Sequence, residues 1–173
     1  SVSVTIAKAK VEIPAADPTP FTYSGGDRTY TLAASGLYTV ADNVRKSAGT
    51  YTVTVTLKDT KNYVWSDNTD AAKTFDFVIA KAPVIVKDKS AYTYDAVPDL
   101  SKPELDKDYT VSGLIGEDKL TTAPMLKYAA APDMNKTGET KIFAEGAEAG
   151  ENYEITYVDG KLTVTSRPSS GGG

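Results

Sequence analysis

The chain has 173 residues, of which 40% are hydrophobic and 24% charged, and its formal net charge of -4 argues against nucleic acid as a partner. This length fits one large or two small domains, and no apolar run approaches the roughly 20 residues that a membrane-spanning helix needs. Histidine and cysteine are both missing from the sequence, which excludes disulfides, thiolate nucleophiles, histidine general bases and the usual zinc ligands.

Short motifs occur twice in the same order, which indicates an internal repeat. The pairs are Ile6–Ala9 with Ile79–Ala82, Phe21–Tyr23 with Tyr92–Tyr94, and Asn62–Trp65 with Asn152–Ile155. We therefore expect a first β repeat over residues 1–82 and a second over 83–166. Residues 1–9 have the pattern of the closing strand of a preceding repeat, and the Ser/Gly-rich residues 167–173 are expected to form a flexible linker.

Apolar residues recur with a period of two, which is typical of β-strands. Residues 51–57 alternate apolar side chains with threonine, and Phe75, Phe77 and Ile79 form a similar inward row. Residues 153–157 and 161–165 alternate in the same way, and Asp159-Gly160 between them predicts a tight hairpin.

Many short strands separated by turns predict an all-β chain with two tandem antiparallel β-sandwich domains of immunoglobulin-like type. The alternative is a pair of β-grasp-like units with one short helix each. The most helix-like segments are residues 41–46 and 116–120.

The second unit resembles the MBG-type tandem domains of bacterial surface proteins, through residues 113–120, 126–128 and 150–164. The first unit resembles the tandem repeats of large Firmicute cell-wall proteins, but Trp65–Asp70 stands where the MBG pattern has Tyr-Val-Asp-Gly. These resemblances imply an extracellular, immunoglobulin-like stalk or adhesin module at the cell surface or cell wall. They carry over no catalytic residue.

Three loop motifs suggest chemistry, but each is better explained as a turn. Asp67–Asp70 lacks the ligand spacing of a calcium loop, so we expect a polar turn. Glu104, Asp106 and Asp108 offer the carboxylates of a glycosidase, yet acids this close in sequence usually form a solvated segment. Gly113–Gly116 resembles a nucleic-acid clamp, but the following Glu117 and Asp118 would repel phosphates.

Tyr63 and Trp65 are the only aromatic pair suited to sugar stacking, and at strand spacing they point to the same face. We expect that face to be the core. No lysine and asparagine are singled out by their spacing for an intramolecular isopeptide bond.

We therefore expect no catalytic, cofactor or metal site, and no ligand-binding residue can be named. The predicted function is a structural spacer in a surface-anchored adhesin-like protein, with neighbouring repeats of the same chain as its contacts. Pro83 restricts the chain between the two units, where no Gly/Ser run occurs. The alternative is a module that binds a host protein or glycan through loops or a sheet edge.

Overall fold

The structure is a computed structural model that describes residues 1–169, and in that range it contains 15 strands and no helix. The all-β class predicted from the sequence is confirmed, while the alternative with one short helix per unit is wrong for the described residues. The chain divides into two compact units, Ser1–Ala80 and Lys81–Gly173. Residues 170–173 of the predicted linker lie outside the described part.

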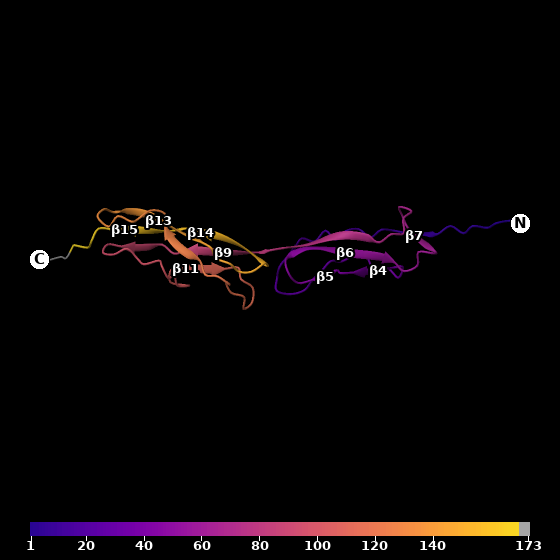
Figure 1. Ribbon diagram of the computed structural model, residues 1–173, viewed down its shortest axis with the longest axis horizontal. Helices are drawn as coiled ribbons and strands as arrows, with labels where there is room; N and C mark the ends of the chain where they lie inside the picture. The colour runs from indigo at the N-terminus through magenta and orange to yellow at the C-terminus, as the bar shows by residue number, and fades with distance from the viewer. Residues whose placement is uncertain (170–173) are drawn as a thin grey trace. The chain divides into compact units, whose positions relative to one another are not determined.

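The first unit is built from eight strands in three sheets (Figure 1). The strands are β1 (Ala9–Val11), β2 (Phe21–Thr22), β3 (Arg28–Thr29), β4 (Tyr38–Ala41), β5 (Val44–Arg45), β6 (Gly49–Leu57), β7 (Tyr63–Trp65) and β8 (Lys73–Ala80). The main sheet has the order β2-β8-β6-β4, and the smaller ones pair β1 with β7 and β3 with β5.

The long strand β6 forms the middle of the first unit because its apolar and polar residues alternate. Val53 and Val55 are completely buried, whereas Thr56 on the other face is exposed. The side chain of Val55 belongs to a core cluster that draws on the main sheet and on the β1-β7 pair. The buried members of this cluster are Val11, Tyr38, Val55, Leu57 and Trp65.

The second unit has seven strands in two sheets (Figure 1). They are β9 (Ala82–Asp88), β10 (Ala91–Thr93), β11 (Tyr109–Ser112), β12 (Met125–Tyr128), β13 (Gly138–Glu145), β14 (Tyr153–Val158) and β15 (Gly160–Val164). One sheet has the order β10-β15-β13-β12 and the other β11-β9-β14.

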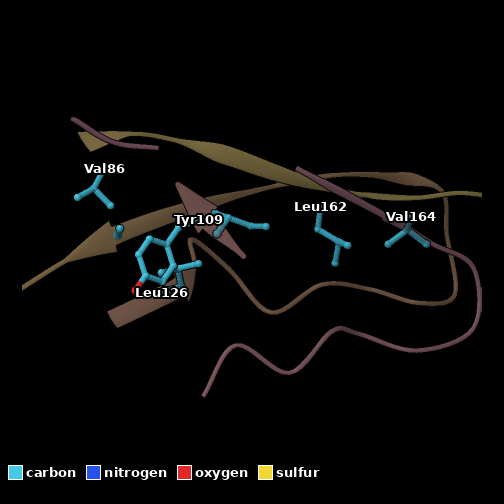
Figure 2. Close-up of a cluster of buried hydrophobic side chains, with 7 residues drawn as sticks. Val86, Tyr109, Leu126, Leu162 and Val164 are labelled. Atoms are coloured by element: carbon cyan, nitrogen blue, oxygen red, sulfur yellow. The ribbon is translucent and has the colours of Figure 1, made fainter. Parts of the chain in front are cut away.

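The core of the second unit lies between these two sheets, an arrangement consistent with a β-sandwich. Val86 and Tyr109 enter it from β9 and β11, and Leu126 enters it from β12 of the other sheet. Figure 2 shows Leu162 and Val164 pointing to the same side of their strand, as residues two apart in a strand must. Burial of these apolar side chains is the main favourable contribution to folding of the unit.

The two units share the strand order of their four-stranded sheets and one further strand pair, whereas the β3-β5 pair of the first unit and β11 of the second have no counterpart among the described residues. The four-stranded sheets β2-β8-β6-β4 and β10-β15-β13-β12 correspond strand by strand, and β1-β7 corresponds to β9-β14. The Ala9 amide donates to the Asn62 carbonyl at 2.8 Å, and the Ala82 amide donates to the Asn152 carbonyl at 2.9 Å. The repeated motifs at these four positions therefore mark equivalent sites in the two units.

The expectation of purely antiparallel sheets is wrong, because each unit contains two parallel pairs. They are β1-β7 and β2-β8 in the first unit, and β9-β14 and β10-β15 in the second. Parallel pairing needs a long connection. Here that connection consists of the intervening strands of the unit and not of a helix, so the absence of a helical pattern did not exclude parallel pairs.

Asp159-Gly160 does not form the predicted hairpin. The strand before it, β14, pairs with β9, while the strand after it, β15, pairs with β13 and β10. The chain thus crosses from one sheet to the other at this point. A Cβ atom at Gly160 would lie 2.7 Å from the Lys89 carbonyl oxygen, so this glycine serves close backbone packing.

The repeated Phe21–Tyr23 and Tyr92–Tyr94 motifs do not mark equivalent positions. Thr22 is exposed and Tyr23 is buried in the first unit, whereas Thr93 is buried and Tyr92 is exposed in the second. A shift by one residue moves every side chain of a strand to the opposite face. The similar residues therefore face opposite sides of their sheets.

The two helix-like segments are strands and turns. Residues 41–46 contain the end of β4 and all of β5, joined at Asp42, which has a left-handed φ of 63°. Residues 116–120 begin with a turn at Gly116, whose φ is 62°, and the Asp118 amide donates to the Ile115 carbonyl at 3.1 Å. Left-handed residues interrupt a helix, so these short segments do not propagate.

Candidate functional site

The second unit has a partly apolar hollow of about 460 Å³ beside strand β11. Tyr109 and Val111 of β11 form one wall, and the loop 113–123 contributes Leu114 and Leu120. Leu105 lies at the edge and is more than half exposed. Apolar concave surfaces of this size with a few polar groups are typical of ligand sites.

Tyr153 holds the loop that lines this hollow. Its hydroxyl donates to the Asp118 carboxylate and accepts a 3.1 Å hydrogen bond from the Ile115 amide. Tyr153 itself is buried and begins β14, which is paired with β9. The loop is therefore attached to the sheet by a rigid aromatic side chain, so the hollow is a preformed feature.

Charged groups border the hollow on two sides. Asp106 lies on one side, and Asp118 and Lys119 come from the loop. Asp106 has a left-handed φ of 68°, and its amide donates to the Tyr109 carbonyl at 2.7 Å. The hollow thus combines an apolar surface with carboxylates at its rim, which suits an amphipathic ligand.

The carboxylates next to Asp106 stabilise their own turn. The Asp108 carboxylate accepts a 2.8 Å hydrogen bond from the Glu104 amide, and Glu104 forms an ion pair with Lys107 at 2.5 Å. Burial raises the pKa of Tyr109, and the nearby negative charges of Asp106 and Asp108 add to this shift. Two of the three acids weighed as glycosidase carboxylates therefore have local structural partners.

Comparison with protein-family models gives one match. Residues 84–163 match the model of the MBG domain (YGX type). Over these residues the second unit is similar to an MBG domain, and we call it the MBG domain. The MBG-type resemblance seen in the sequence is thereby confirmed for these residues, which include every residue of the hollow described above. No curated protein matches the chain.

Strand β9 of the MBG domain ends in a buried acid. Asp88 is only 2% exposed, and neither carboxylate oxygen has a hydrogen-bond partner among residues 1–169. Burial, with a smaller repulsion from Asp159, raises the pKa of Asp88 to about 6. Asp159 forms an ion pair with Lys141 at 2.6 Å. Asp88 occupies the inward position that Val84 and Val86 predict for an apolar residue.

In the first unit, the Asp67–Asp70 segment forms a turn held by its own side chains. The Asp67 carboxylate accepts hydrogen bonds from the Thr69 amide at 3.0 Å, the Thr69 hydroxyl at 2.6 Å and the Lys73 ammonium at 2.6 Å. The hydrogen bond from Lys73, followed by those from Thr69, lowers the pKa of Asp67 to about 2. Both oxygens of this carboxylate thus have partners within the turn.

Trp65 is completely buried, which confirms its predicted place in the core. Its indole N–H donates to the Ala71 carbonyl at 2.8 Å, and its ring centroid lies 5.8 Å from that of Tyr38. Tyr63 packs against the same cluster and is half-buried. Neither ring forms an open platform for a sugar.

Sequence reasoning did not find the hollow or Asp88. The sequence signal for Asp88 is an acid that continues the alternating inward row of β9. The signal for the hollow is weaker, because Leu105, Leu114 and Leu120 are isolated apolar residues in turn-rich segments. Residues 1–169 contain no cluster of three or more acidic side chains that could bind a metal ion. In the same range, no helix is long and apolar enough to cross a membrane.

Proposed function

We propose that the chain is a non-catalytic, load-bearing spacer of a bacterial protein at the cell surface or cell wall, built from two tandem immunoglobulin-like β-sandwich domains. The resemblance of both units to surface-protein repeats supports this proposal, as does the MBG domain match over residues 84–163. The shared strand order of the two units supports a common domain type.

The observation that carries the proposal is the pairing of an early strand with the last strand of each unit. In the MBG domain, β10 is parallel to β15, and the Thr165 amide extends the pair with a 2.8 Å hydrogen bond to the Thr93 carbonyl. In the first unit, β2 is parallel to β8, and the Tyr23 amide donates to the Ala80 carbonyl at 2.9 Å.

This pairing resists tension for a geometric reason. In a parallel pair, the upstream end of the early strand and the downstream end of the last strand lie at opposite ends of the pair. A pull on the two ends of the unit therefore shears the strands, and all their hydrogen bonds bear the force together. Forced unfolding depends on the unfolding rate, so such a pair should slow the unfolding of a unit under load.

The connection between the units also supports a spacer. Only Lys81 separates the end of β8 from the start of β9, and Pro83 has a fixed φ. Few backbone torsions are thus free at the junction. Because the chain contains no cysteine, one cysteine can be introduced in each unit, and a spin label can be attached to each. The proposal expects a narrow distribution of label-to-label distances, and a broad one contradicts it.

Single-molecule pulling on the full chain tests the load-bearing role. Thr165→Pro removes the amide that bonds to Thr93, and it should lower the unfolding force of the MBG domain. Leu126→Ala is the matched control. It leaves a cavity in the core outside the β10-β15 pair and should lower the free energy of unfolding by about 2–5 kcal/mol.

The proposal expects Thr165→Pro to reduce the unfolding force more than Leu126→Ala does, even where Leu126→Ala is the more destabilising at equilibrium. If force follows equilibrium stability alone in the two variants, the parallel pair bears no special load and the proposal fails.

The hollow beside β11 favours a second candidate function, the binding of a partner. Leu105 is exposed at its edge, next to the carboxylate of Asp106. A panel of immobilised host and cell-wall glycans can be probed with the full chain and with Leu105→Asp. Binding that Leu105→Asp abolishes and Val44→Asp, an exposed position in the first unit, preserves would support this function. Equal binding by both variants would exclude the hollow as the binding site.

A further inference from the structure

The first six residues carry an exposed apolar row with no partner in the structure. Val2, Val4 and Ile6 alternate with Ser3 and Thr5, and their exposed fractions are 93%, 82% and 90%. The segment is not part of any strand and contains no charged side chain. Exposed alternating apolar segments without charges readily pair with other strands, and proteins normally protect them.

The internal repeat gives this segment the position of a closing strand. Ile6–Ala9 repeats as Ile79–Ala82, where Ile79 and Ala80 end β8 and Ala82 begins β9. The equivalence continues into the structure, because Ala9 begins β1 and its amide bonds to Asn62 as that of Ala82 bonds to Asn152. Residues 1–7 therefore precede β1 as β8 precedes β9.

The inward residues also correspond. With Ile6 aligned to Ile79, Val4 takes the position of Phe77 and Val2 that of Phe75. In β8, Phe77 and Ile79 are buried and Asp76 between them is exposed. This strand lies between β2 and β6 in its sheet. The row of residues 2, 4 and 6 thus has the spacing of a strand that is buried on one face.

We propose that residues 1–7 form the closing strand of a further β unit of this same type, one that lacks its own last strand. Val2, Val4 and Ile6 enter the core of that unit, and the backbone pairs with its equivalents of β2 and β6. A second copy of this chain is not the partner, because β8 and β15 already fill the equivalent places in its two units. This inference goes beyond the spacer function.

The test lengthens the 173-residue chain with a copy of residues 8–73 placed ahead of Ser1. This copy is the first unit without most of β8, and residues 1–7 then stand where residues 74–80 would follow. Amide hydrogen exchange is measured at residues 2–6. We expect these amides to exchange at least roughly 100-fold more slowly in the lengthened chain than in the 173-residue chain.

Substitutions in the lengthened chain check the register. Val4→Asp should remove the protection, because a charge would enter the core. Ser3→Asp is the matched control and should preserve it, because the equivalent Asp76 is exposed in β8. Val4→Phe should increase protection, because it supplies the same side chain as Phe77 in the equivalent position. This variant also tests whether the smaller valine fails to protect the strand only because it leaves a cavity.

A chain with a complete copy of residues 8–80 ahead of Ser1 is the positive control for folding of the added unit. If that added unit folds but residues 2–6 exchange freely in the lengthened chain and in its Val4→Phe variant, the proposal is wrong. It is equally wrong if residues 2–6 of the 173-residue chain become protected as its concentration rises, since a second copy would then cover the row.

Discussion

Gly113 lies directly against the carbonyl of Pro83: a Cβ atom at position 113 would be 2.2 Å from that oxygen. Gly113 also has a left-handed φ of 98°, which L side chains rarely adopt. The loop that lines the hollow thus leaves β11 through a position where only glycine fits against the start of β9. The sequence suggested a turn at this glycine, and the structure adds close backbone packing as a second reason for it.

Gly113→Ala should destabilise the MBG domain by about 2–4 kcal/mol, because it combines overlap with the backbone and an unfavourable φ. Denaturant unfolding of the full chain measures the change. Gly138→Ala is the matched control in the same unit, because nothing lies within 4 Å of a Cβ atom there and its φ is not left-handed. Equal effects of the two substitutions would contradict the close packing at Gly113.

The buried Asp88 should make the stability of the MBG domain depend on pH. Its pKa is about 6 in the folded state against an ordinary 3.8, so the folded state holds the proton more tightly than the unfolded state. The contribution of Asp88 to stability is therefore greatest below about pH 4, and it falls by about 3 kcal/mol in total as the pH rises through 6.

Asp88→Asn removes this titration, so its stability relative to wild type should rise between pH 4 and pH 7. Denaturant unfolding at several pH values measures the difference, and Asp76→Asn, at an exposed position in the first unit, is the control. A constant difference between Asp88→Asn and wild type across this range would show that Asp88 does not titrate there.

Thr22 and Thr93 occupy similar sequence motifs but opposite faces, so they should respond differently to a charge. Thr93 is 8% exposed, and its hydroxyl donates to the Ala96 carbonyl at 2.7 Å. Thr93→Asp should destabilise its unit by about 2–4 kcal/mol, because it buries a carboxylate. Thr22→Asp should change stability by less than about 0.5 kcal/mol. Thermal unfolding of both variants tests the assignment, which a reversed order would contradict.

The Asp67 turn makes a prediction for spectroscopy. Its carboxylate should titrate at a pKa of about 2 because of hydrogen bonds from Lys73 and Thr69. Lys73→Met removes the largest cause and should move the pKa of Asp67 upward toward its ordinary value. NMR titration of the Asp67 carboxyl carbon measures both. An unchanged pKa in Lys73→Met would show that the ion pair has no influence.

Local patterns in the sequence were sufficient to identify the strands and much of the core. The alternation in residues 51–57 correctly placed Val53 and Val55 inside, and the strand spacing correctly buried Trp65. These predictions succeed because the direction of a side chain in a strand depends only on the parity of its position. The MBG-type resemblance of the second unit is likewise a property of the residues themselves.

Strand partners depended on the tertiary structure. Asp159-Gly160 has the local chemistry of a hairpin, yet β14 and β15 join different sheets. Ile155 of β14 and Leu162 of β15 pack into the same hydrophobic cluster from these two sheets. The same holds for the register of Thr22 and Thr93. Local propensity does not distinguish a turn within a sheet from a crossing between sheets.

The amino-acid sequence by itself determined that this chain is an all-β protein with a repeated pattern, because a period of two needs no partner to be recognised. Only the tertiary structure decided that early and last strands pair in parallel, that Asp88 is buried without a hydrogen-bond partner in the described part of the chain, and that a hollow lies beside β11. The parallel pairs and the burial of Asp88 depend on residues far apart in the chain, and the loop that lines the hollow is held by Tyr153 of β14. Such contacts are fixed by packing of the whole unit.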